Sequence, residues 1–254
     1  KLFGTDGIRG IANEYPMTSE MAVKIGKSVA VKSKKEGGYS TIIVGRDTRL
    51  SGNMIECGLI SGICAMGIDA LLAEVIPTPG VAFLTSSLKA NAGIVVSASH
   101  NPFYDNGIKL FNGDGYKLSD KEEAEIEYLI FDNNRLSDNI SSKNIGSIRV
   151  IDNAPTRYSN FLKSTLSNKL SFKGVKIVID CSNGATYKIA PALFSDLGAE
   201  IIPLNISPDG TNINDNCGSE YTENVIKKVL ENKADIGIAF DGDGDRLVAV
   251  DENG

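Results

Sequence analysis

Residues 40–47 read Ser-Thr-Ile-Ile-Val-Gly-Arg-Asp, a short run that is β-branched and wholly apolar at its centre. Such a run predicts a strand buried on both faces, and strands of that kind belong to sheets covered by helices on both sides. The segments around it alternate between strand-like and helix-like patterns, which indicates βαβ units. We therefore predict an α/β fold with mainly parallel or mixed sheets.

Outward from this strand, helical and strand-like periodicities divide the chain into short elements. The predicted helices cover residues 18–34, 52–66, 81–88, 120–130, 156–166, 185–198 and 222–233. The predicted strands cover residues 70–75, 92–97, 173–182, 199–205, 234–240 and 246–250. Glu36-Gly37-Gly38 ends the first helix, and Ser119 with Glu122 forms a capping box at the start of the helix at 120–130.

A polar stretch rich in Asn and Ser, residues 132–147, is the best linker candidate between two sets of elements. We predict two three-layer αβα domains, one at residues 1–150 and one at residues 151–254. The chain begins without a methionine and stops in a turn after a strand-like run. We expect it to be a fragment of a longer protein.

Composition excludes several functional classes. The 26 basic and 32 acidic residues give a net charge of -6, and no cluster of Lys and Arg suits a nucleic-acid partner. No apolar run reaches the roughly 18 residues that span a bilayer, and no secretion signal is recognisable. We expect a cytoplasmic protein without a membrane partner, whose four cysteines are reduced thiols.

A buried strand, residues 93–96, runs into Ser97-Ala98-Ser99-His100-Asn101-Pro102. Pro102 removes a donor and biases Asn101 away from helix, so we expect the hydroxyls to lie in a tight, exposed loop beyond the strand. His100 is the only histidine of the chain. A serine hydrolase is disfavoured, because neighbouring side chains on an extended loop point apart and no Gly-x-Ser-x-Gly elbow surrounds the serine.

Several cationic side chains stand among glycines in loops of the first predicted sheet: Arg9, Arg46, Arg49 and Lys109. Glycine lets backbone N–H groups approach an anion, and the guanidinium fork matches phosphate oxygens. Because ligands bind beyond the carboxyl ends of strands in such sheets, these residues together predict a phosphate site.

Three carboxylates, Asp241, Asp243 and Asp245, alternate with glycine in a turn near the end of the chain. Oxygen ligands favour a hard cation, and we predict Mg²⁺ completed by phosphate oxygens. An EF-hand is an alternative, since Glu252 occupies position twelve, but Arg246 replaces the glycine of position six and the flanks look like strands. The other alternative is a solvated acidic turn. A phosphate on Ser99 would complete the site, which predicts phosphoryl transfer through a serine.

These motifs carry a family resemblance. "FGTDGIRG", "GRDTRLSG", "SASHNPFYDNGIKLF" and "FDGDGDR" occur in this order and span the chain. The sequence resembles the α-D-phosphohexomutase family, and "IPTPGVAFLT", "DCSNGATYKIAP" and "SPDGTNINDNCGS" resemble its bacterial branch that acts on glucosamine phosphates. The resemblance implies an isomerase of carbohydrate metabolism that interconverts glucosamine 6-phosphate and glucosamine 1-phosphate on the route to UDP-N-acetylglucosamine.

The resemblance also implies a role for each matching residue. Ser99 is the phosphorylated nucleophile and passes its phosphoryl group to the sugar through hexosamine 1,6-bisphosphate. Asp241, Asp243 and Asp245 bind Mg²⁺ together with the phosphate on Ser99. Arg9, Lys109 and Arg246 neutralise the transferring group. His100 is a candidate general acid or base.

The sequence departs from the family in one large way, because the loops typical of its sugar-binding third and phosphate-binding fourth domains do not occur. We expect this chain to hold the phosphoserine and the metal but to lack mutase activity alone. Two other functions stay open: a mutase of the same family acting on glucose or mannose phosphates, and a non-catalytic module that binds a divalent metal.

Overall fold

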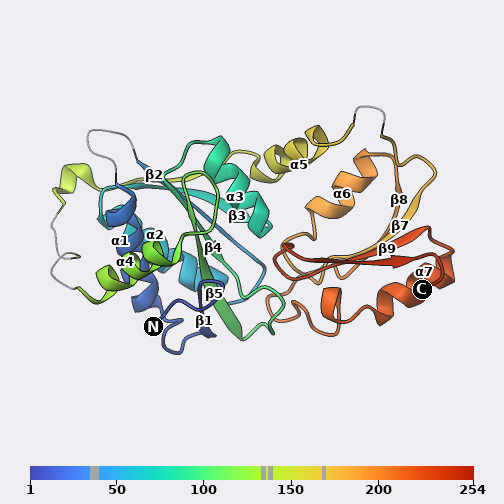
Figure 1. Cartoon of the computed structure of the whole chain (residues 1–254), viewed down its shortest axis with the longest axis horizontal. Helices are drawn as coiled ribbons and strands as arrows, with labels where there is room; N and C mark the ends of the chain where they lie inside the picture. Colours follow the sequence, from blue (N-terminus) through green and yellow to red (C-terminus); the bar gives the residue numbers. More distant parts are fainter. Residues whose placement is uncertain (35–39, 133–135, 137–139, 168–169) are drawn as a thin grey trace.

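The computed structural model describes residues 1–34, 40–132, 136, 140–167 and 170–254. They form two α/β halves, each built on one sheet, which lie next to each other along the long axis of the molecule (Figure 1). Both sheets are parallel at their centre and carry antiparallel strands at an edge. The predicted fold class is confirmed.

The first half contains a six-stranded sheet in the order β1-β5-β4-β2-β3-β6. Its strands are β1 (Ile8–Ile11), β2 (Thr41–Arg46), β3 (Asp69–Val75), β4 (Ala92–Val96), β5 (Asp105–Asn112) and β6 (Ile148–Val150). β2 pairs in parallel with β3 and β4, whereas β5 runs antiparallel to both β4 and β1.

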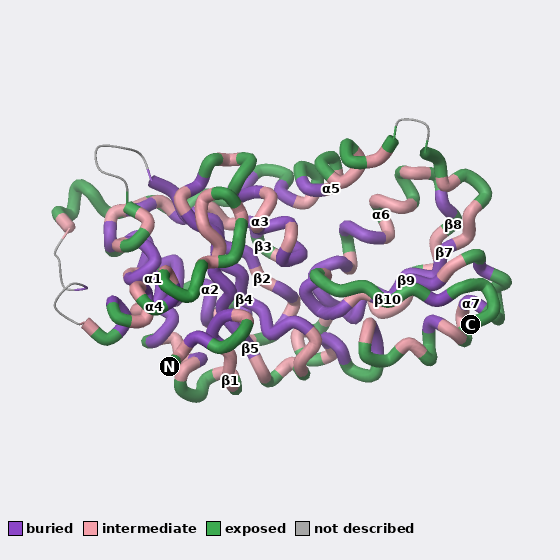
Figure 2. The backbone as a smooth tube through the Cα atoms, viewed as in Figure 1, coloured by how far each residue is buried: buried purple, intermediate pink, exposed green. Residues whose placement is uncertain are grey.

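The central strands of this sheet are buried (Figure 2), and their apolar side chains pack against helices on both faces. Ile42 and Val44 of β2 pack into one cluster with the helices α1 and α2, whereas Ile43 between them packs into another with α3. The helices of this half are α1 (Ser19–Ser33), α2 (Gly52–Ala65), α3 (Thr78–Ser87) and α4 (Asp120–Phe131).

The second half contains a four-stranded sheet in the order β10-β9-β7-β8. Its strands are β7 (Lys176–Asp180), β8 (Glu200–Leu204), β9 (Ile236–Phe240) and β10 (Leu247–Asp251). α6 (Ile189–Asp196) packs on the face that carries Ile177 and Ile179, and α7 (Glu223–Asn232) packs on the face that carries Val178. Each half therefore has three layers.

The two halves meet at several points. The helix α5 (Ala154–Ser164) contacts α3 of the first half and α6 of the second, with Tyr158 in the apolar cluster of the first half. Polar contacts join the loops beyond the strands: Thr48 Oγ1 donates a hydrogen bond of 2.6 Å to the carbonyl oxygen of Asn183. The loops after β2, β4, β7 and β9 thus gather where the sheets face each other.

Most predicted elements are confirmed, including the capping box of Ser119 and Glu122. Three strands were missed, β1, β5 and β6. The prediction that Arg9 and Lys109 lie in loops is wrong, since they lie on β1 and β5. α3 begins at Thr78, earlier than predicted, and α6 begins later, at Ile189. The predicted helix stop at Glu36-Gly37-Gly38 and residues 133–135 and 137–139 of the linker at 132–147 lie outside the described residues. No helix in the described part combines the length and apolarity needed to span a bilayer.

Candidate active site

The serine loop, residues 97–102, follows the carboxyl end of β4, and its residues 97–99 are buried. Ser99 is 1% exposed and has a φ of 55°, in the left-handed region. Its backbone N–H donates to Ser97 Oγ at 2.9 Å, and Ser97 Oγ donates to Asp47 Oδ2 at 2.6 Å. The expectation of an exposed and extended loop is wrong at Ser97 and Ser99, because these two bonds, one of them to Asp47 after β2, fold the chain into a buried tight turn.

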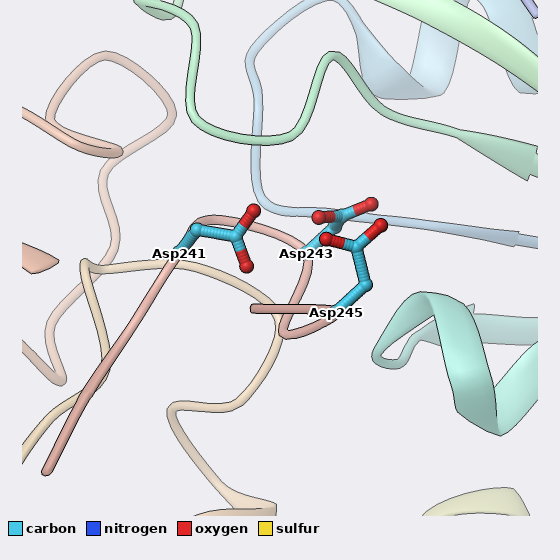
Figure 3. Close-up of side chains that lie close together, drawn as sticks. All are labelled: Asp241, Asp243 and Asp245. Carbon is cyan, nitrogen blue, oxygen red and sulfur yellow. The ribbon is translucent and has the colours of Figure 1, made fainter. Parts of the chain in front are cut away.

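The acidic loop, residues 241–246, connects β9 to the antiparallel β10. Its three carboxylates offer ligand oxygens that all lie within 4.8 Å of one another. Figure 3 shows the side chains of Asp243 and Asp245 close together, with Asp241 at the start of the same turn. Strands on both sides of the loop rule out an EF-hand, which needs flanking helices.

The two loops are in direct contact. Ser99 Oγ donates a hydrogen bond of 2.6 Å to Asp241 Oδ2, although 142 positions separate the residues. A second hydrogen bond joins the acidic loop to the first half: the hydroxyl of Thr78, at the start of α3, donates to Asp243 Oδ2 at 2.5 Å. The Ser99 oxygen therefore points into the carboxylate cluster, and a group attached to it would lie beside any cation held there.

Lys109 is the main positive charge of the site. Its ammonium lies 2.8 Å from Asp243 Oδ2 and 3.0 Å from Asp245 Oδ2. It also lies 3.0 Å from Asp6 Oδ2, in the N-terminal loop before β1. The antiparallel pairing of β5 with β4 brings this lysine next to the serine loop, with Lys109 opposite Val95.

The other predicted cations flank this centre. Arg9 Nη2 lies 2.8 Å from the same Asp6 oxygen, and its buried Nε has no hydrogen-bond partner. On the other side, Arg246 Nη1 lies 3.2 Å from His100 Nδ1. Because a guanidinium only donates, Nδ1 of a neutral His100 accepts and its proton sits on Nε2. The structure thus joins Arg9, Lys109 and the carboxylates through Asp6, and His100 to Arg246.

Two other cations of the predicted phosphate site, Arg46 and Arg49, have partners away from the acidic loop. Arg49 is 2% exposed, and its guanidinium pairs with Asp47 and donates to main-chain carbonyl oxygens of the serine loop. Arg46 pairs with Glu56 of α2 at 3.1 Å. Each guanidinium thus has a carboxylate partner in the first half.

Burial and charge set the protonation of the cluster. Burial, with the nearby Asp243 charge, raises the pKa of Asp241 to about 7. Burial also acts to raise the pKa of Asp243, but the Lys109 ammonium outweighs it and holds that pKa below its usual value. The same carboxylates raise the pKa of Lys109 against the effect of its own burial. Near neutral pH, Lys109 is therefore an ammonium, Asp243 is a carboxylate, and Asp241 is partly protonated.

The residues fit a hard divalent cation. All three side chains offer oxygen, the ligand type that Mg²⁺ prefers. Oδ1 of Asp243 is buried and has no hydrogen-bond partner. A buried carboxylate oxygen needs a donor or a cation, and a bound metal ion would supply one. Asp241, Asp243 and Asp245 could together hold such a cation.

Three site residues had no place in the sequence predictions: Asp6, Asp47 and Thr78. Asp47 follows a predicted buried strand directly, and this position was the one available signal for it. The others act through contacts with residues far away in the sequence, for which a single sequence contains no pattern. Beside His100 a cavity of about 600 Å³ opens between the serine loop and residues 211–221.

Comparison with protein families gives two matches along the chain. Residues 1–136 match the model "Phosphoglucomutase/phosphomannomutase, alpha/beta/alpha domain I", and residues 156–254 match the corresponding domain II. Together they contain both the serine loop and the acidic loop.

Similar proteins agree with these matches. A phosphoglucosamine mutase of Syntrophus aciditrophicus is 57% identical over 256 residues, and one of Geobacter sp. strain M21 is 54% identical over 254. Each alignment covers 100% of this chain but only 57% and 56% of the relative, so the chain spans about half the length of these relatives. A solved phosphoglucomutase/phosphomannomutase family protein of Burkholderia thailandensis superposes with a TM-score of 0.84 and 29% identity, over 100% of this chain and 55% of its own.

Proposed function

Because the chain belongs to the phosphoglucomutase/phosphomannomutase family, we propose that it is the phosphoryl-transfer part of a phosphohexomutase. In this proposal residues 1–150 form a domain that carries the reacting serine, and residues 151–254 form a domain that carries the metal. The observation that supports it most directly is the hydrogen bond of 2.6 Å from Ser99 Oγ to Asp241 Oδ2, which joins the two motifs.

Ser99 is the proposed nucleophile. Its oxygen accepts a phosphoryl group from a hexose bisphosphate and returns one to a hydroxyl of the sugar monophosphate. Mg²⁺, held by Asp241, Asp243 and Asp245 together with the phosphate on Ser99, would supply electrostatic stabilisation of the transferring group. Lys109 and Arg9 carry positive charge on one side of the cluster. There they would stabilise the negative charge that develops on the equatorial oxygens of the transferring phosphoryl group.

His100 is the proposed general acid or base, positioned by Arg246. The bond from Arg246 Nη1 at 3.2 Å leaves Nε2–H free to donate to a leaving oxygen. Nε2 then takes a proton back from the attacking hydroxyl in the return transfer. Arg246 has a second proposed role as a phosphate ligand.

For the substrate we propose glucosamine 6-phosphate and glucosamine 1-phosphate, with hexosamine 1,6-bisphosphate as intermediate and primer. The 57% and 54% identity to proteins named phosphoglucosamine mutase supports this choice over glucose or mannose phosphates. We propose a cytoplasmic location, since all four cysteines are free thiols in the structure.

The covalent step is tested by intact-mass analysis of the chain after incubation with a hexose 1,6-bisphosphate. We expect a gain of one phosphate that peptide mapping places on Ser99, and its loss in Ser99→Ala. A phosphate retained after this substitution would assign the nucleophile elsewhere, first to Ser97. The isolated chain should not turn over glucosamine 6-phosphate, and turnover would contradict the proposal that further domains position the sugar.

Two further measurements separate the alternatives. Isothermal titration with Mg²⁺ should show tighter binding to the phosphorylated chain than to Ser99→Ala, whereas a non-catalytic metal module would bind equally in both. A full-length protein that carries this chain should turn over glucosamine phosphates faster than glucose or mannose phosphates. The reverse order would assign it to another mutase of the family.

A further inference from the structure

Two main-chain oxygens of the serine loop are held from two sides. The carbonyl oxygens of Ser99 and Asn101 each accept a hydrogen bond of 2.8 Å from Arg49 Nη2. The same two oxygens accept bonds of 2.9 and 3.0 Å from Asn214 Nδ2. Arg49 belongs to the first half and Asn214 to the second, so the loop that carries Ser99 is held by both.

Arg49 is a fixed donor. Its Nε lies 2.9 Å from Asp47 Oδ2, and both side chains of this pair are 0% exposed. Its Nη1 also donates to the carbonyl oxygens of Pro102 and Asp105. A planar guanidinium with every donor engaged holds its fork in one orientation. The first half thus presents a rigid edge to the serine loop.

Asn214 is fixed in the second half. Its backbone N–H donates to the carbonyl oxygen of Ser182 at 2.9 Å, and its φ is 59°, in the left-handed region that asparagine tolerates. Its amide also borders the acidic loop, since a Cβ added at Gly242 would lie 2.8 Å from Nδ2. The position of this amide therefore depends on where the acidic loop and its carboxylates lie.

The serine loop needs such support. Ser99 has a φ of 55°, a conformation that a serine adopts only when its surroundings impose it. Rotation of the backbone at Ser99 would turn Oγ away from Asp241 and would require both shared carbonyl oxygens to leave their donors. The direction of the nucleophile is therefore coupled to the two carbonyl contacts.

We propose that Asn214 is a positioning residue for Ser99. Together with Arg49 it forms a carbonyl clamp, defined by the four hydrogen bonds to the oxygens of Ser99 and Asn101. The clamp closes only when the second half is docked, so that Ser99 Oγ is aimed at the carboxylates only when the acidic loop is in place. The catalytic consequence rests on the proposed function, whereas the clamp itself does not.

The chain offers a matched pair of variants. Asn216 lies on the same loop, also with a positive φ, of 49°, but it is exposed and its side chain donates to Asp215 instead of the serine loop. Asn214→Gly and Asn216→Gly therefore remove the same side chain from two left-handed positions without a change of charge. Glycine is tolerated at both backbone conformations.

Amide hydrogen exchange of the 254-residue chain tests the clamp directly. In Asn214→Gly we expect exchange in the peptide covering residues 98–106 to accelerate about tenfold, because two buried hydrogen bonds are lost. In Asn216→Gly the same peptide should match the unsubstituted chain. Equal exchange in both variants, or an acceleration spread evenly over the whole chain, would overturn the proposal.

Kinetics of a full-length protein that carries this chain test the consequence for the reaction. Asn214→Gly should lower kcat about tenfold or more at unchanged KM, because the nucleophile is misdirected while sugar binding is not touched. Asn216→Gly should leave both constants unchanged. A raised KM at constant kcat would overturn the positioning role. If the unsubstituted protein shows no mutase activity, the proposed function fails while the exchange result still decides the clamp.

Discussion

The ammonium of Lys109 lies 2.8 Å from Oδ2 of Asp243, and the two side chains are only 5% and 1% exposed. The same ammonium reaches Asp6 and Asp245, so one lysine neutralises carboxylates from both halves. A buried charge cluster of this kind is stable only while its cation is present. Lys109 therefore holds the acidic loop together when no other cation is bound.

Replacement of this lysine tests that role. Lys109→Met should lower the free energy of unfolding in the presence of a chelator by about 3 kcal/mol, because it leaves buried carboxylates without a partner. Millimolar Mg²⁺ should restore much of the loss. Urea unfolding measures both effects, and Lys227→Met, at a side chain that is 70% exposed, is the control with an expected change below about 0.5 kcal/mol. Equal urea midpoints of the two variants would contradict the role.

The backbone of the acidic loop lies close to the serine loop at Gly242. A Cβ at this position would lie 2.7 Å from the carbonyl oxygen of Ser99 and 2.8 Å from Asn214 Nδ2. Gly242→Ala should push the loops apart and destabilise the chain by about 2 kcal/mol. Gly4→Ala is the control, because its nearest contact would be an ordinary 3.6 Å. Urea unfolding should show a lower free energy of unfolding for Gly242→Ala than for Gly4→Ala. A Gly242→Ala chain as stable as the unsubstituted chain would contradict the close packing of Gly242 against Ser99 and Asn214.

The raised pKa of Asp241, about 7, predicts a pH dependence of stability without metal. Between the unfolded value near 3.8 and the folded value near 7, the folded chain binds more protons than the unfolded chain. Its stability should therefore fall as pH rises through this window. From pH 5 to pH 7 we expect a loss on the order of 2 kcal/mol in chelator, measured by urea unfolding.

Asp241→Asn provides the control for this dependence, because asparagine cannot ionise. The difference between the two chains should vanish near pH 4 and grow toward pH 7. An identical slope in both chains would show that other groups cause the dependence.

The cysteines predict a pattern of chemical reactivity. Burial raises the pKa of Cys181 and of Cys217 to about 12, and burial also raises the pKa of Cys64, whereas Cys57 is exposed. The thiolate is the reactive form, and at pH 8 a thiol of pKa 12 has a thiolate fraction of roughly 10⁻⁴. A thiol reagent should therefore modify Cys57 of the native chain quickly, and the three buried cysteines only after unfolding. Cys57→Ser should remove the fast phase.

The comparison of sequence and structure shows which features were predictable. The serine loop and the acidic loop could be found, because each is a local motif directly after an apolar strand. The strands β1 and β5 could not be predicted, since glycines interrupt both segments and hide the alternation of apolar and polar residues that marks a strand. Lys109 was therefore selected for its charge but placed in the wrong kind of element.

Arg49 shows a second limit. Arginine among glycines is typical of a phosphate site, but here its partners are a neighbouring aspartate and main-chain oxygens. Every residue has a carbonyl group, so no sequence pattern marks those acceptors. Asn214 escaped prediction for the same reason.

The contact between Thr48 and Asn183 has a consequence for folding, because it joins positions 135 residues apart. Contacts of such long range form late, after each half has its own core. During synthesis, at 5–20 residues per second, the segment around Ser99 leaves the ribosome roughly ten seconds before its partners in the second half. Until then the nascent chain has no formed active site. We therefore expect the serine loop to be accessible to chaperones and proteases until the second half has folded.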